Sequence, residues 1–180
     1  MKVLRKFRRD ERGVAAVEFA LLAPVLVLFY FGLVELSQAI IADRKTNHVA
    51  SSVGDLVSQT ETVSTTDLTD IFSISNTVMA PFPTSTLGMR VTSVTANAQG
   101  VPKVIWSRAY GGMGPLSSTV GTIAMPMAMA AGDSMIVAES QYTYNSVLHF
   151  VLPNALHYDE IFYLRPRRSD QVTCTDCPAT

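Results

Sequence analysis

The sequence predicts an α+β protein, in which a long N-terminal transmembrane helix continues into a small head with an antiparallel sheet of about four strands. Two observations predict this class. Residues 14–34 are apolar apart from Glu18, and apolar residues at helical spacing follow as far as residue 57. Two later segments, 89–95 and more loosely 104–110, alternate apolar and polar side chains as strands do, and two further strands are predicted after them. A helix followed by a run of strands is typical of α+β architecture.

The first element is the helix, predicted at residues 14–59. Its 21-residue stretch at 14–34 matches the roughly 20 residues that a helix needs to cross a bilayer. The leader at residues 1–13 carries six basic side chains against Asp10 and Glu11, so the positive-inside bias keeps it cytoplasmic and places the rest beyond the membrane. Pro24 should bend the helix, and Gly32 should add flexibility.

The second element is an exported α+β head at residues 60–180. It should begin with a short helix capped at Thr66 that runs to about residue 79, where prolines follow. Strands are predicted at 89–95, 104–110, 135–144 and 160–165, with a hairpin turn at 97–100. Residues 111–132, rich in glycine and methionine, are predicted as a long exposed loop, and the C-terminal tail as flexible.

The boundary between leader and helix reads Gly13-Val14-Ala15-Ala16-Val17-Glu18-Phe19. A secretory signal peptide would have a shorter apolar region without an interior carboxylate. A plain uncleaved anchor fits the hydrophobicity equally well and leaves Gly13 and Glu18 unexplained. An ionisable residue inside a span usually has a function.

This string, continued by Ala20 and Leu21-Leu22-Ala23-Pro24, resembles the start of TadE-like minor pseudopilins of tight-adherence (Flp-type) pilus systems. The resemblance covers roughly residues 8–58, and two further segments, 55–59 and 167–174, are also similar to the family. It implies a pilin-like architecture and cleavage by prepilin peptidase between Gly13 and Val14. It also implies a role in assembly for Glu18 and Phe19.

The resemblance further implies the partners and the location. The partners are prepilin peptidase, other pilus subunits and minor pseudopilins, the inner-membrane assembly platform and the lipid bilayer. The protein would lie in the bacterial inner membrane, with a single pass and a periplasmic head, or in the assembled pilus.

Charge pairing between subunits is the role that we expect for Glu18. Cleavage after Gly13 creates an α-amine on Val14, and an unpaired charge in apolar surroundings is unfavourable. Pairing between the Val14 amine and the Glu18 carboxylate of neighbouring subunits would set the axial stagger of their helices. The alternative is that Glu18 lies at the headgroup level beside the basic leader.

Charge excludes one class of function. The chain has 14 basic and 15 acidic residues, and removal of residues 1–13 leaves 8 basic against 13 acidic, a net charge of −5. The exported part therefore lacks the basic surface that nucleic-acid binding requires.

Catalytic and metal motifs are weak. His48, His149 and His157 do not have the spacing of a metal site, and Gly132-Asp133-Ser134 reads as a turn into a strand better than as a nucleophile motif. We expect no enzymatic activity, no metal and no cofactor.

Cys174 and Cys177 form a CxxC pair near the C-terminus. The pair supplies half of the ligands of a structural zinc site, and it lacks the thioredoxin-like context of a redox pair. A local disulfide is favoured in an oxidising periplasm.

Together these observations favour a structural minor pseudopilin of a Tad/Flp type IV pilus assembly machine, active in pilus biogenesis and adhesion. The alternatives are an uncleaved single-pass anchored periplasmic scaffold or binding protein, and a secreted enzyme.

Overall fold

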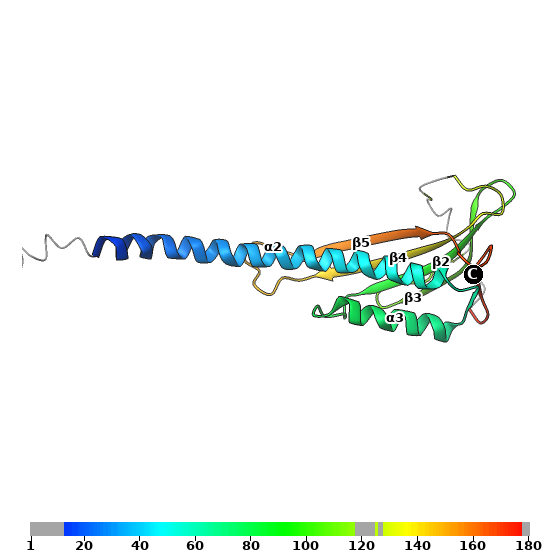
Figure 1. The fold of residues 1–180 in the computed structure, drawn as a ribbon, viewed down its shortest axis with the longest axis horizontal. Coiled ribbons are helices and arrows are strands. Elements are labelled where there is room, and N and C mark those ends of the chain that lie inside the picture. The colour runs from blue at the N-terminus through cyan, green and yellow to red at the C-terminus, as the bar shows by residue number, and fades with distance from the viewer. Residues whose placement is uncertain (1–12, 118–124, 126–127, 178–180) are drawn as a thin grey trace, which may run out of the picture.

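The computed structural model describes residues 13–117, 125 and 128–177. Its longest element is the helix α2, Val14–Ser58, which has 45 residues and extends well beyond the head (Figure 1). At 1.5 Å per residue the helix is about 68 Å long. The predicted fold class is confirmed: an apolar N-terminal helix precedes a small α+β head. The leader predicted at residues 1–13 lies, except for Gly13, outside the described residues.

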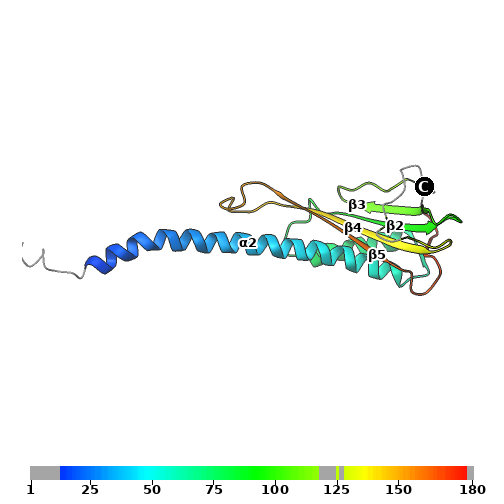
Figure 2. The ribbon, with the colours of Figure 1, turned by 90° about the horizontal axis from the view of Figure 1, so that it is seen from above.

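The two halves of α2 have different surroundings. From Val14 to Phe31 almost every side chain is exposed, whereas the second half contributes a buried stripe. The stripe recurs every three or four residues and consists mainly of small side chains, which lets the helix lie close to the sheet. Its buried members are Gly32, Glu35, Ala39, Ala42, Thr46, Val49, Ala50, Val53, Gly54, Val57 and Ser58. Pro24 lies inside the helix, which curves without breaking along its N-terminal half (Figure 2).

The second described helix, α3, spans Thr65–Met79 and packs beside α2. It begins two residues earlier than the sequence predicts, because Ser64 and not Thr66 caps it. The Ser64 hydroxyl accepts a hydrogen bond from the Asp67 N–H (3.1 Å), and the Asp67 carboxylate accepts one from the Ser64 N–H (2.8 Å). This reciprocal capping box satisfies two backbone donors that the first turn leaves free.

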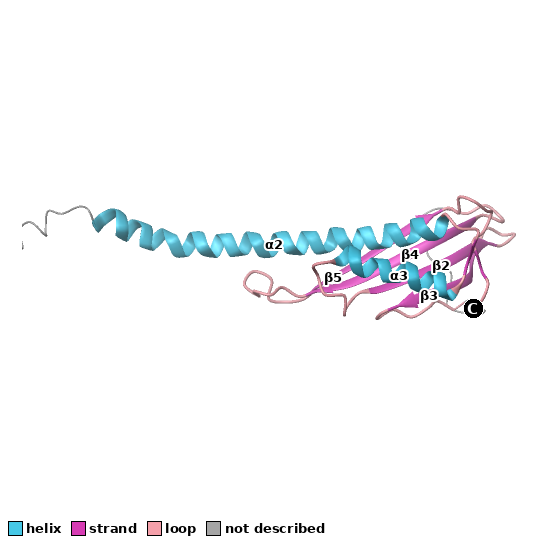
Figure 3. Ribbon diagram, turned by 60° about the horizontal axis from the view of Figure 1, so that its bottom comes forward, coloured by secondary structure: helices cyan, strands magenta, loops and turns pink. Residues whose placement is uncertain are grey.

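The sheet has four antiparallel strands, as predicted. They are β2 (Gly88–Ala96), β3 (Pro102–Tyr110), β4 (Ser134–Tyr144) and β5 (Leu156–Leu164), in the order β3-β2-β4-β5. Helices α2 and α3 lie side by side on one face of this sheet (Figure 3).

Strand β5 begins four residues before its predicted start at residue 160. Its first half contains His157, Asp159 and Glu160, which weaken the apolar signal of a strand. The position at the edge of the sheet explains this composition, because one side of an edge strand faces solvent.

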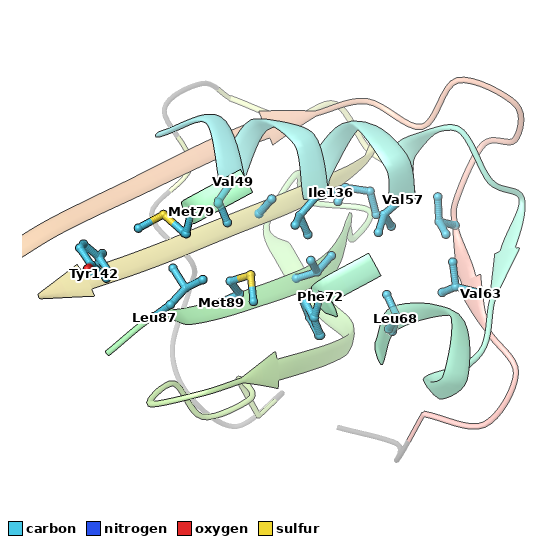
Figure 4. Packing of buried hydrophobic residues seen from close by; sticks show 14 of the residues in the cluster. Val49, Val57, Val63, Leu68, Phe72, Met79, Leu87, Met89, Ile136 and Tyr142 are labelled. Carbon is cyan, nitrogen blue, oxygen red and sulfur yellow. The ribbon is translucent and has the colours of Figure 1, made fainter. Parts of the chain in front are cut away.

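The core lies between the two helices and the sheet (Figure 4). Val49 and Val57 of α2, Leu68 and Phe72 of α3, and Ile136 of β4 are almost completely buried there. Both helices and the sheet supply large side chains to this core, so the C-terminal half of α2 is part of it.

The C-terminal segment packs on the head as far as Cys177, whereas the sequence predicts a flexible tail. The short strand β6 (Thr173–Cys174) pairs in parallel with β1 (Thr62–Val63). Val172 is fully buried, and its carbonyl accepts a hydrogen bond of 2.9 Å from the Trp106 indole. The burial of Val172 and the hydrogen bond from the Trp106 indole together hold the C-terminal segment in place.

Candidate functional site: the apolar half of α2 and its junction with the head

The N-terminal half of α2 is an apolar surface without cover inside the chain. Within the described residues α2 is the one helix that is long and apolar enough to cross a membrane, and its most apolar stretch is entirely unburied. Leu21, Phe29 and Tyr30 are each more than 60% exposed. An apolar patch of this size does not stay in contact with water in a soluble protein, so a bilayer or neighbouring helices must cover it.

Gly13 and Val14 stand where the described chain begins. Gly13 is the N-cap residue of α2 and has ordinary helical angles, φ −79° and ψ −20°. A Cβ atom at this position would have nothing within 4 Å among the described residues. The described fold therefore does not itself require glycine at position 13.

Glu18 and Phe19 lie on the exposed surface, Phe19 with 68% of its side chain accessible. Glu18 is four residues after Val14, so the two lie on the same face one helical turn apart. Within the part of the chain that the structure describes, the Glu18 carboxylate forms neither an ion pair nor a hydrogen bond. A partner for this carboxylate must come from outside these residues.

Glu35, which the sequence analysis did not single out, joins the apolar half of α2 to the head. Its side chain is 2% exposed. One carboxylate oxygen accepts a hydrogen bond from the Phe150 N–H (3.2 Å) and the other from the Val151 N–H (2.6 Å). Both donors belong to the loop that joins β4 to β5, residues 145–155. This carboxylate thus ties the loop to the helix.

The same loop borders a groove on α2. Val151 lies against Gly32, where an added Cβ would come within 3.1 Å of its Cγ2 atom. Phe150 and Val151 form one wall of the groove, and the helix forms the other with Val25, Leu28, Phe29, Gly32, Leu33 and Leu36. The groove is apolar and extends along three turns of α2. The sequence contains a signal for this groove, because residues 147–152 are all apolar except His149, as the N-terminal half of α2 is apolar.

The opposite end of α2 meets the C-terminal segment. Arg167 forms an ion pair with Asp55, and its N–H donates to the Ser58 carbonyl (2.8 Å). The two segments at 55–59 and 167–174, which the sequence analysis noted separately, are therefore neighbours.

Cys174 and Cys177 are joined by a disulfide, with their Cα atoms 5.5 Å apart. Asp176 lies between them and accepts hydrogen bonds from the Thr65 hydroxyl (2.6 Å) and the Thr65 N–H (2.7 Å). These two bonds lower the pKa of Asp176 below its ordinary value of 3.8. Because the sulfur atoms are bonded to each other, the pair offers no thiolate to a metal.

The three histidines belong to three different parts of the described fold. The ring of His48 is within 3.3 Å of the Ser52 hydroxyl on α2, and that of His157 is 3.0 Å from the Thr143 hydroxyl on β4. His149 occupies the β4–β5 loop with φ 51°. Gly132, with φ 84°, makes the turn that leads into β4, as the sequence predicts.

These features define a class: an α+β protein with one apolar N-terminal helix that can serve as a single-pass membrane anchor and is continuous with its head. Residues 13–54 match the family model described as TadE-like protein, which confirms the resemblance over that segment and is consistent with a TadE-like protein of Tad pilus systems. The match starts at Gly13 and ends inside α2. No curated protein and no solved structure matches the chain.

Proposed function

We propose that this chain is a structural minor pseudopilin of a Tad/Flp type IV pilus assembly machine, cleaved by prepilin peptidase between Gly13 and Val14. The mature chain would begin at the first residue of α2. It would reside in the bacterial inner membrane with its head in the periplasm and take part in pilus biogenesis and adhesion. Its partners would be other pilus subunits and minor pseudopilins on the inner-membrane assembly platform.

One observation carries this proposal: the family match begins at Gly13, the residue after which the cut is expected. The geometry at Gly13 supports it, because neither the backbone angles nor the described neighbours explain a glycine there. A peptidase that encloses the chain at the cleavage site would explain the glycine. A side chain at position 13 would prevent the enzyme from closely approaching the backbone of the scissile bond.

Glu18 would act after cleavage. The new amine of Val14 and the Glu18 carboxylate of a neighbouring chain are opposite charges in an apolar bundle, where each needs a partner. Glu18 is exposed and unpaired among the described residues, so it is accessible to such a partner. The contact would fix the stagger between adjacent helices, with Phe19 beside it in the apolar interface.

The intact mass of the membrane-inserted protein tests this function. The chain is expressed with and without the prepilin peptidase of a Tad system, extracted in detergent and weighed by mass spectrometry. Loss of residues 1–13 only when the peptidase is present supports the proposal. An unchanged mass in both cells would instead identify an uncleaved single-pass scaffold or binding protein, and cleavage after a small residue elsewhere would identify a secreted protein.

A further inference from the structure

We propose that the tip of the β4–β5 loop, residues 147–152, is a second membrane contact, which inserts its apolar side chains into the outer leaflet beside α2. The ligand is the acyl-chain region of a phospholipid bilayer. This inference rests on the part of the proposed function in which α2 spans the membrane with the head outside. It is independent of cleavage after Gly13 and of assembly into a pilus.

The position of the loop tip along α2 is the first argument. Residues 14–34 would span about 32 Å at 1.5 Å per residue, close to the roughly 30 Å of the hydrocarbon core. Val151 lies against Gly32, and Phe150 borders the groove whose other wall reaches Val25. With the N-terminus inside, residues 25–34 occupy the outer half of the bilayer. The loop tip therefore overlaps the outer leaflet. Figure 1 shows the β4–β5 loop alongside α2.

The chemistry of the loop tip agrees with that position. Residues 145–155 contain no Asp, Glu, Lys or Arg. Four apolar side chains are turned outward, with Val147 92%, Leu148 47%, Phe150 52% and Val151 43% exposed. Exposure of such a cluster to water is unfavourable, because apolar surface is more stable in an apolar environment. Insertion into lipid removes it from water.

Backbone groups usually prevent a loop from entering lipid, because the hydrocarbon offers no hydrogen-bond partner to an unsatisfied N–H. Glu35 satisfies the N–H groups of Phe150 and Val151. The Ser146 hydroxyl accepts a further bond from the Leu148 N–H (3.4 Å). Leu148, Phe150 and Val151, three of the four exposed apolar residues at the tip, thus have backbone donors already bonded within the chain.

Lipid and a second copy of this chain are the two candidate occupants of the groove beside Phe150. The groove is continuous with the apolar surface of α2, which favours lipid. The groove beside Phe150 is formed by the same helix surface that the bilayer covers when α2 spans the membrane, and no charged side chain lines it. Lipid that surrounds α2 at this depth therefore fills the groove and contacts the loop without any additional partner.

The test uses the full chain in vesicles of phosphatidylethanolamine and phosphatidylglycerol. Both native cysteines are in the disulfide, so Phe150→Cys introduces one free thiol for an environment-sensitive fluorophore. The matched control is Val101→Cys, because Val101 is 43% exposed in the turn joining β2 to β3 and lies at the opposite end of the sheet. Leu148→Cys provides a second site in the loop tip in case Phe150→Cys does not fold.

A nitroxide group on the lipid acyl chain should quench most of the fluorescence at position 150 and little at 101, whereas a water-soluble quencher should do the reverse. This pattern must persist when the protein is diluted in lipid. Equal access of the water-soluble quencher to both sites would overturn the proposal. Protection at 150 that disappears on dilution would also overturn it, in favour of a second copy of the chain.

Glu35→Ala tests the positioning role of the carboxylate, with Glu61→Ala as its control on an exposed residue. In the Glu35 variant the fluorophore at 150 should lose most of its acyl-chain quenching while α2 stays in the membrane. Unchanged quenching would show that Glu35 does not hold the loop tip in place.

Discussion

Arg167 and Asp55 form an ion pair that joins the C-terminal segment to the last turns of α2. The contact includes the backbone, because the Arg167 N–H donates to the Ser58 carbonyl at 2.8 Å. Two parts of the chain that are more than 100 residues apart thereby meet at the end of the head that lies away from the apolar half of the helix.

Arg167→Ala should lower the free energy of unfolding by at most about 1 kcal/mol, because both side chains of the pair are substantially exposed and solvent weakens their attraction. Urea unfolding of the full chain in detergent measures the loss. Arg168→Ala, an exposed arginine next to it, is the control and should be close to neutral. A double-mutant cycle with Asp55→Ala that gives no coupling would mean that the backbone bond alone holds the segment.

Gly13→Asp should block maturation, because the side chain would prevent close approach of the peptidase to the scissile bond. The precursor should accumulate with its fold intact, since a Cβ at position 13 meets nothing within 4 Å. Immunoblots with mature-sized and precursor-sized standards measure the ratio. Gly112→Asp is the matched control, as its Cβ would also meet nothing within 4 Å. Normal processing of the Gly13 variant would contradict the pseudopilin proposal.

Glu18→Ala should leave cleavage unchanged and abolish incorporation with other pilus subunits. Its proposed partner, the Val14 amine of a neighbour, exists only after cleavage, and removal of one member leaves the other charge unpaired in an apolar bundle. Pull-down of partner subunits beside a cleavage assay separates the two steps. Glu61→Ala, which removes an exposed carboxylate of the head, should recover partners normally. Normal recovery by the Glu18 variant would remove the pairing mechanism.

Gly54→Ala should destabilise the head by about 1–3 kcal/mol, the usual cost of overpacking. Its Cβ would lie 2.5 Å from the Leu164 Cδ1 atom and 2.9 Å from the Ala138 Cβ atom. Gly32→Ala should be nearly neutral, because only the Val151 side chain must yield and alanine gains about 1 kcal/mol of helix propensity. Thermal unfolding compares the two. Similar losses would show that α2 has room to move away from the sheet.

Acid should release the start of α3 from the C-terminal segment. Hydrogen bonds from the hydroxyl and N–H of Ser64 lower the pKa of Asp67, and those from Thr65 lower the pKa of Asp176. Both pKa values are below the ordinary 3.8, so their stabilisation is complete above that pH and is lost as pH falls through the lowered values. The Thr65 amide NMR signal should move in that range in the wild type. In Asp176→Asn most of that movement should be absent.

The long helix, the short helix and the sheet were predictable from local signals. These are apolar residues at helical spacing, a cap with prolines after the helix, and alternation in the first two strands. The start of α3 was missed by two residues, because the cap is Ser64 and not Thr66, and only Ser64 has Asp67 three residues later. Strand β5 was predicted too short because its first residues are polar on the exposed edge of the sheet.

The contacts that sequence reasoning did not find are those without a local pattern. The pairing of Thr62 with Thr173 involves strands of two residues, which are too short to show alternation. The role of Glu35 depends on a loop more than 100 residues later that returns to its side. Predicting that bond requires the register of β4 and β5, because the register places the loop next to the outer end of the apolar stretch.

The absence of a break in α2 between its apolar half and its buried stripe has a mechanical consequence. One continuous helix carries the exposed stretch at one end and part of the head's core at the other. A pull or a twist applied to the apolar end is transmitted to the sheet directly, because no flexible linker lies between them to absorb it. When the helix rises out of a bilayer or rotates within it, the head moves through the same displacement and turns by the same angle.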